Sequence, residues 1–211
     1  MNGVQLAVSE QEKDIGVLIK NKLKPTAHCE KAARTAAGVL GQILRAFSFR
    51  DRRVLPKLYA QYVRPHMEFA VQAWAQWSRG DTETLENVQK RLVKAVTGLK
   101  EATYEDRCKE LGLDTLAKRR RDHDMVQTFK IIHGIDNVDR ATWFTLMDPN
   151  RSHRTRLAEG GPMLVGSLAR LELRKNFFSQ RVVEHWNRLP VAARTAGSVA
   201  QFKNLLKTLP H

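Results

Sequence analysis

The chain has 211 residues, 42% of them hydrophobic and 27% charged, which is the composition of a globular protein with a buried core and excludes wholesale disorder. A formal net charge of +14 favours a polyanionic partner. Nucleic acid is the commonest such partner and an anionic membrane the second. The alternative is a basic surface that binds no partner. No apolar run approaches the roughly 18–20 residues that span a bilayer, and the first residues lack the pattern of a secretory signal.

The first segment has the alternation of extended chain. Val4, Leu6 and Val8 alternate with other residues, and a second short run, Asp14–Ile19, contains Gly16. The pattern predicts a small β-hairpin in which Gly16 allows another part of the chain to approach the backbone closely.

From Pro25 onward the apolar residues recur at helical spacing. One stripe runs from Cys29 to Phe47, and a second runs from Val54 to Val63, where Pro65 should kink or restart the helix. Asp51 and Asp81 are expected to cap the helices that follow them. Further helices are predicted after Thr103, after Asp114, around Trp143 and after Ser198.

The segment from Asp148 to Glu172 breaks this pattern. It is rich in glycine, proline and arginine, and we expect a long basic loop with a short strand or second hairpin near Met163–Leu173. The predicted fold class is therefore mainly α, a helical bundle with a small N-terminal β-hairpin and a long basic loop. The pattern divides the chain into residues 1–24, 25–147 and 148–211.

The stretch "RKNFFSQRVVEHWNRLP" combines aromatic and basic residues. Asn176 is expected to cap a helix that ends before Pro190, with Phe178, Val182 and Trp186 on one face. Such a face is either a platform for stacked bases or part of a core, and aromatic residues at helical spacing favour the core.

No catalytic or metal-binding pattern stands out. The histidines are scattered, Cys29 and Cys108 are far apart, and no phosphate-binding glycine loop or zinc motif is present. We therefore expect neither a cofactor nor a metal. Asp122 and Asp124 flank His123, where a salt-bridged helix surface is the simpler reading. The two distant cysteines indicate a reducing compartment, so we expect an intracellular protein of the nucleus or cytoplasm.

The basic clusters are the candidate binding residues. Four consecutive cations sweep a broad arc of a helix, which either faces solvent or lies against a phosphate backbone. Basic residues of the loop and of the aromatic helix would add further contacts to the phosphate backbone. The candidate nucleic-acid contacts are Lys118, Arg119, Arg120, Arg121, Arg154, Arg156, Arg174, Lys175 and Arg181.

Several long segments together resemble one family. They are "KDIGVLIKNKLKPTAHCEKAARTAAGVLGQILRAF", "LYAQYVRPHMEFAVQAW", "LENVQKRLVKAVTGLKEATYEDRCKELGLDTLAKRRRDHDMVQTFKIIHG" and the aromatic stretch with "SVAQFKNLL". In this order they are similar to the end of the palm, the thumb and the C-terminal region of non-LTR retrotransposon (LINE) reverse transcriptases of the jockey and chicken-repeat type.

This resemblance implies a role without catalysis. The Ala-Asp-Asp motif of the family's RNA-directed DNA polymerase is absent, so we expect no polymerase activity from this chain alone. "DIGVLI" would correspond to the primer-grip strand, and the helices from Thr26 to Gly98 to the thumb. The implied partner is an RNA–DNA hybrid or RNA, bound without sequence preference.

The chain also departs from the family pattern. Asp14-Ile15-Gly16 stands where the family has an aromatic residue followed by Leu-Gly, and Ala75-Gln76-Trp77 stands where Asn-Pro-Tyr is expected. These departures indicate a diverged copy. The alternative function is a helical protein–protein interaction module that self-associates through exposed apolar surface and has no nucleic-acid role.

Overall fold

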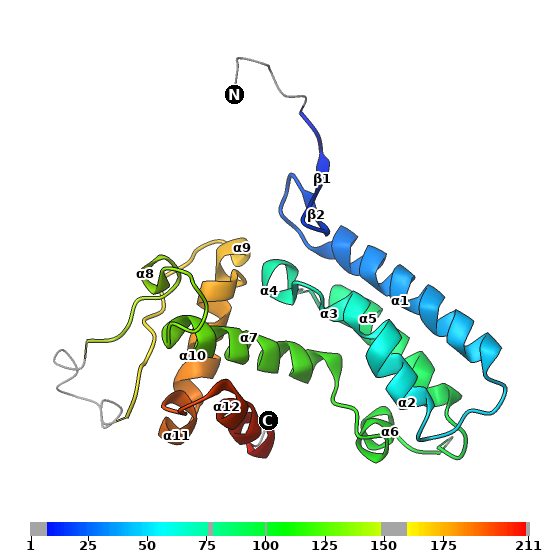
Figure 1. Ribbon diagram of the computed structural model, residues 1–211. Helices are drawn as coiled ribbons and strands as arrows, with labels where there is room; N and C mark the ends of the chain where they lie inside the picture. Colours follow the sequence, from blue (N-terminus) through cyan, green and yellow to red (C-terminus); the bar gives the residue numbers. More distant parts are fainter. Residues whose placement is uncertain (1–7, 76–77, 100, 149–159, 210–211) are drawn as a thin grey trace. The chain divides into compact units, whose positions relative to one another are not determined.

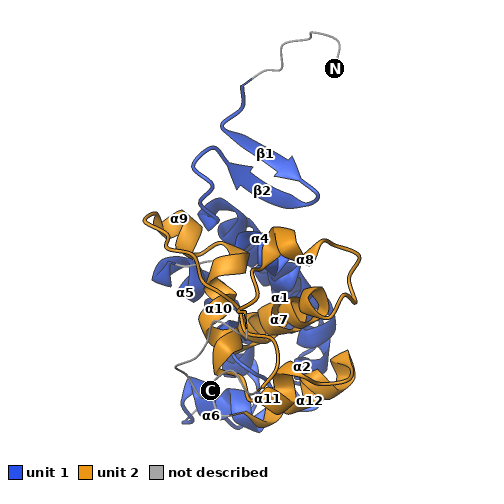
Figure 2. Cartoon of the chain, turned by 90° about the vertical axis from the view of Figure 1, so that its left-hand side faces the viewer, with its two compact units in different colours: residues 1–117 blue, residues 118–211 orange. Residues whose placement is uncertain are grey.

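The computed structural model describes residues 8–75, 78–99, 101–148 and 160–209. It confirms a mainly α fold with a small N-terminal β-hairpin (Figure 1). Two compact units divide the chain between Ala117 and Lys118, each with its own hydrophobic core (Figure 2). This division lies within the range 25–147 that the sequence pattern treated as one region.

The first unit contains the hairpin and the longest helix. Its elements are β1 (Gln11–Asp14), β2 (Val17–Lys20), α1 (Thr26–Ala46), α2 (Leu55–Leu58), the π-helical turn η1 (Tyr59–Val63), α3 (Pro65–Glu68), α4 (Val71–Trp74), α5 (Arg79–Ala95) and α6 (Tyr104–Glu110). The second unit begins within α7 (Leu116–Ile132) and contains α8 (Arg140–Trp143), α9 (Glu172–Lys175), α10 (Phe178–Arg188), α11 (Val191–Arg194) and α12 (Val199–Thr208).

The hairpin is antiparallel and turns at Ile15 and Gly16, both with positive φ, which is typical of a two-residue hairpin loop. Gly16 therefore lies in the turn and not within a strand as predicted. The predicted close approach is present, because a Cβ at Gly16 would lie 3.2 Å from the ring of Phe69. The expected alternation at Val4 and Leu6 lies outside the described residues.

α1 and α5 form the centre of the first unit. They run in the same direction, since Thr26 Oγ1 at the start of α1 donates to Asp81 Oδ2 in the first turn of α5 at 3.1 Å, and both helices end beside one pocket. Asp81 is thus not the N-cap; Ser78 is, because its hydroxyl accepts from the Asp81 amide. The predicted α1 stripe is buried from Cys29 to Leu40, and small residues on it allow α5 to pack closely: Cys29, Ala32, Ala33 and Ala36.

The helix after α1 is interrupted where the sequence predicted it. The segment passes from α2 through one π-helical turn to α3, which starts at Pro65 because proline has no amide hydrogen to continue the ladder. Leu55, Tyr59 and Val63 are fully buried along one face. Tyr62, also predicted to face inward, is exposed because it lies outside this i, i+4 row.

A buried polar chain joins α5 to α6 and to the start of α7. Tyr59 Oη donates to Gln89 Oε1 at 2.8 Å, and Gln89 Nε2 donates to Tyr104 Oη at 3.0 Å. Tyr104 in turn donates to the Glu86 carboxylate, which also accepts the Leu116 amide at 3.2 Å. Burial, followed by this carboxylate, raises the pKa of the Tyr104 phenol, so the tyrosine stays protonated and donates.

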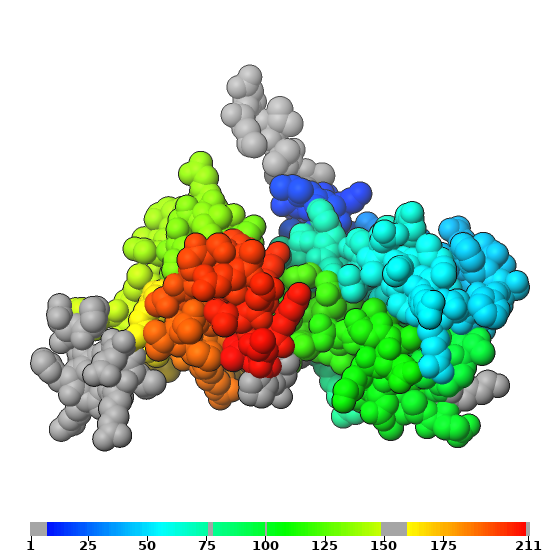
Figure 3. Space-filling view, turned by 60° about the horizontal axis from the view of Figure 1, so that its bottom comes forward, coloured from blue at the N-terminus to red at the C-terminus, as the bar shows by residue number. Residues whose placement is uncertain are grey.

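The second unit is built around α10. Phe178, Val182 and Trp186 are at most 4% exposed, which confirms the prediction that this face fills a core. Phe129 and Phe202 stack with their ring centroids 4.5 Å apart in the same core. The C-terminal helices α11 and α12 gather on one face of this unit (Figure 3).

Two details of the second unit differ from expectation. Asn176 does not cap α10, which begins at Phe178 without a side-chain cap; its amide donates to Glu172 O instead. In place of a second hairpin, the described residues contain an isolated antiparallel bridge between Leu146 and Leu164.

Candidate anion-binding site

The four consecutive cations lie in the first turns of α7. Arg121 is exposed, Lys118 and Arg119 are half-buried, and Arg120 is only 7% exposed. Consecutive residues of a helix point in directions about 100° apart, so at least one of them faces the interior. Arg154 and Arg156 lie outside the described residues.

Arg181 is held in an internal ion pair. Its Nε and Nη2 donate to the two carboxylate oxygens of Asp124 at 2.8 and 2.9 Å, and its Nη1 donates to Asn176 O at 3.0 Å. Both side chains are largely buried, and burial raises the pKa of the Asp124 carboxyl although Arg181 opposes that shift. Asp124 is therefore salt-bridged as predicted but is buried and not on the surface, and Arg181 is not among the proposed ligand contacts.

The remaining predicted cations lie on α9. Lys175 is exposed and pairs with Glu172 at 2.6 Å, and the guanidinium of Arg174 lies 5.4 Å from the ring centre of Phe177. The predicted set is thus dispersed in the second unit over α7, α9 and α10, and several of its members already have partners in the protein.

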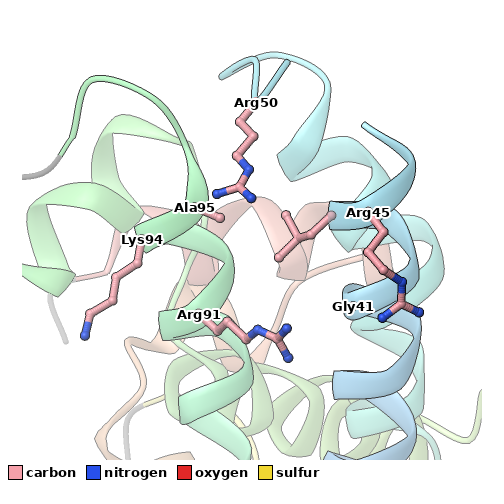
Figure 4. Close-up of a pocket in the computed structure, with 7 residues that line it drawn as sticks. Gly41, Arg45, Arg50, Arg91, Lys94 and Ala95 are labelled. Atoms are coloured by element: carbon pink, nitrogen blue, oxygen red, sulfur yellow. The ribbon is translucent and has the colours of Figure 1, made fainter. Parts of the chain in front are cut away.

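A different group of cations converges in the first unit. Arg45, Arg50, Arg91 and Lys94 line a pocket of about 410 Å³ with Gly41, Leu44 and Ala95 (Figure 4). Arg91 reaches from α5 across the gap towards α1, and Arg50 comes down from the loop after α1, whereas Lys94 points away from the other three.

Gly41 provides the surface on which two of the guanidinium groups meet. A Cβ built at Gly41 would lie 3.8 Å from Arg45 Nη1 and 3.9 Å from Arg91 Nη2, so both nitrogens face the same small volume. Arg45 comes from the last turn of α1 and Arg91 from the penultimate turn of α5. The parallel packing of the two helices therefore brings together arginines that are far apart in the sequence.

The loop that carries Arg50 is fixed to the end of α5. Arg50 O accepts the Thr97 amide at 3.2 Å. The neighbouring Arg52 donates to Thr97 O and Gly98 O at 3.3 and 3.1 Å and pairs with Glu110 at 2.7 Å. The loop thus bridges the C-terminal ends of both helices beside the pocket.

The electrostatics of the pocket favour an anion. Among the described residues, Arg45, Arg50, Arg91 and Lys94 have no acidic partner, and all four are exposed. The negative ends of two helix dipoles account for a cation in each last turn, which are Arg45 and Lys94. They do not account for Arg91 or Arg50, so the pocket holds more positive charge than the helix ends require.

No pattern in the sequence indicated this group. Arg45, Arg50 and Arg91 are single arginines in otherwise ordinary helical and loop segments, and only the contact between α1 and α5 unites them. A run of adjacent cations is visible in the sequence, whereas cations that meet by tertiary packing are not.

Two other kinds of site find no support among the described residues. No group of three or more His, Cys, Asp or Glu is placed to hold a metal ion there, and none of the helices described is long and apolar enough to cross a membrane. Comparisons of the chain with protein-family models, with curated proteins and with solved structures found no match.

Proposed function

We propose that this chain binds nucleic acid through its phosphates, without sequence preference and without catalysing a reaction. The observation that carries this proposal is the pocket that Arg45, Arg50 and Arg91 line with no acid beside them among the described residues. Guanidinium groups match phosphate oxygens in charge and in hydrogen-bond geometry.

Exposed aromatic residues favour nucleic acid over a small inorganic anion. Phe47 and Phe49, on the loop that carries Arg50, are 42% and 78% exposed. Phe47 was predicted to face inward and does not. Aromatic rings beside cations are the usual means of binding single-stranded nucleic acid, because every base has a face that can stack. The resemblance to the thumb of LINE reverse transcriptases supports the same partner, RNA or an RNA–DNA hybrid.

The second unit would add weaker contacts. Arg121 and Arg174 are exposed and are suited to distant phosphates. Arg120 and Arg181 are too buried for this task. Lys118, Arg119, Lys175 and the loop residues Arg154 and Arg156 stay predictions.

A second candidate function, self-association, has its own observation. Several large apolar side chains of the first unit are exposed, among them Ile15 at 86%, Leu23 at 55% and Phe69 at 55%. Exposed apolar groups of this kind mark protein interfaces when they are contiguous. Light scattering that shows dimers at 0.2 M salt without nucleic acid would favour this function.

Salt-dependent binding tests the proposed function. If about six phosphates are neutralised, the affinity for a short RNA–DNA hybrid should fall about a thousandfold between 50 and 200 mM salt, because counterions are released on binding. Fluorescence anisotropy with duplexes of unrelated sequence measures both the slope and the lack of preference. Absence of binding at 50 mM salt, or an affinity that does not change with salt, would contradict the proposal.

Primer extension tests for catalysis. The hybrid is incubated with the protein, deoxynucleotides and Mg²⁺ or Mn²⁺, and a boiled sample serves as control. We expect no extension above that control, and incorporation would contradict a non-catalytic role.

A further inference from the structure

We infer that the pocket formed by Arg45, Arg50 and Arg91 binds a terminal phosphate group, a phosphomonoester dianion, such as the 5′-phosphate at the end of a nucleic-acid strand. The inference deepens the proposed function and rests on it for the source of that phosphate. It follows from the charge of the pocket and the positions of its donors.

The charge of the pocket exceeds that of one internal phosphate. Four cations line it with no acid beside them among the described residues, and the guanidinium nitrogens of Arg45 and Arg91 face one volume, whereas a phosphodiester carries a single negative charge. A phosphomonoester carries about 1.5 to 2 negative charges at pH 7 and has three acceptor oxygens. Arg45 and Arg91, which approach from two helices, can each pair with one of these oxygens.

Small residues leave room for the group. Gly41 has no side chain, and Ala95 and Leu44 supply the apolar part of the wall. The nitrogens of Arg45 and Arg91 nearest to Gly41 already face one volume, so little rearrangement is needed to bind one phosphate between them. Phe49, next to Arg50 in the loop, is exposed and available to stack on a terminal base.

The experiment compares two oligonucleotides that differ only at one end. A 12-nucleotide single strand with a 5′-phosphate and the same strand with a 5′-hydroxyl are titrated against the full chain at 150 mM salt and pH 7.5. We expect the phosphorylated strand to bind at least about tenfold more tightly, because even one charge-assisted contact is worth about that factor. Equal affinities would overturn the inference.

Substitutions locate the preference. Arg91→Gln and Arg45→Gln should each abolish most of the tenfold difference, and Arg91→Lys should keep part of it because lysine preserves the charge but not the fork. Arg34→Gln is the matched control, since it removes the same charge from an exposed position of the same helix about 16 Å from Arg45. A preference that survives in Arg91→Gln, with circular dichroism showing native helix content, would also overturn the inference.

Two further measurements distinguish free phosphate from the phosphate of a nucleic-acid end, and distinguish failure of this inference from failure of the proposed function. Inorganic phosphate at pH 7.5 should shift the backbone amide signal of Gly41 and should do so less at pH 5.5, where the dianion is protonated. Strong but equal binding of both oligonucleotides would retain the proposed function and end this inference. Binding of inorganic phosphate at Gly41 without binding of either strand would support the pocket as a site for free phosphate and end the nucleic-acid proposal. Neither kind of binding would end both.

Discussion

Two groups of arginines, one in each unit, have opposite surroundings. In the first unit, Arg45, Arg50 and Arg91 line one pocket and have no acidic partner among the residues described. In the second unit, Arg181 donates through Nε and Nη2 to the carboxylate of Asp124 and is largely buried. One group of cations is exposed around a pocket, and the other holds two helices together.

This difference shows that the net charge of a sequence overstates its attraction to polyanions when some of its arginines form ion pairs inside the protein. An arginine beside a buried carboxylate stabilises the fold, whereas arginines that repel one another do not. Substitutions in the two units should therefore separate stability from binding.

The largest effect is expected from Arg181→Ala. Removing the guanidinium leaves the Asp124 carboxylate buried without its bidentate partner, which should lower the free energy of unfolding by about 3–5 kcal/mol. Urea denaturation followed by circular dichroism measures this change.

Arg121→Ala is the matched control for this loss, because Arg121 is exposed and its removal should change stability by no more than about 0.5 kcal/mol. Similar values for the two variants would show that the buried pair does not hold α7 to α10.

A smaller loss of stability is expected at acidic pH, through the protonation of His28. Burial, followed by the nearby Lys31, lowers the pKa of this imidazole from its ordinary value of 6.5, and its Nδ1 accepts the Leu18 amide at 3.1 Å. As the pH falls below about 6.5, the unfolded chain binds a proton that the folded chain resists, so the free energy of unfolding should decrease from pH 7 to pH 5.

The contribution of His28 is the difference between the wild type and His28→Gln, which does not titrate. Urea midpoints at pH 7 and pH 5 supply the comparison. His185 has a lowered pKa for a related reason, burial and then Arg121, so some acid sensitivity should persist in this variant. An unchanged acid response would mean that His28 does not couple protonation to folding.

The smallest effect on stability is expected from Arg91→Gln. No acid pairs with Arg91 among the residues described, and Arg45 lies nearby, so the change should stay within about 0.5 kcal/mol and should not be strongly destabilising. The same denaturation measurement tests this. A loss comparable to that of Arg181→Ala would show that the pocket arginines are structural and would remove the contrast between the two units.

Much of the fold could be predicted from the sequence because it follows local rules. The buried faces of α1 and α10 repeat at helical spacing, Pro65 restarts a helix, and Thr103 and Ser198 accept the amides expected of N-caps. The errors occurred where a tertiary contact competed with a local one. Asp81 was expected to cap α5, but its carboxylate accepts from Thr26 of the neighbouring helix.

Little of the candidate site could be predicted, for a related reason. The run Lys118–Arg121 is conspicuous in the sequence, yet one of its members is buried, and Arg181 is paired with a carboxylate 57 positions away. The pocket depends on the parallel alignment of two helices and on a loop that joins their ends, and neither leaves a mark on local composition.

The contacts of Arg52 should affect the rate at which the pocket binds a ligand. By binding two carbonyls at the end of α5 and Glu110, Arg52 keeps the loop in place before any ligand arrives. A loop that is already ordered loses little conformational entropy on complex formation. Association should then be limited by encounter, and substitution of Arg52 should slow capture even though its own side chain points elsewhere.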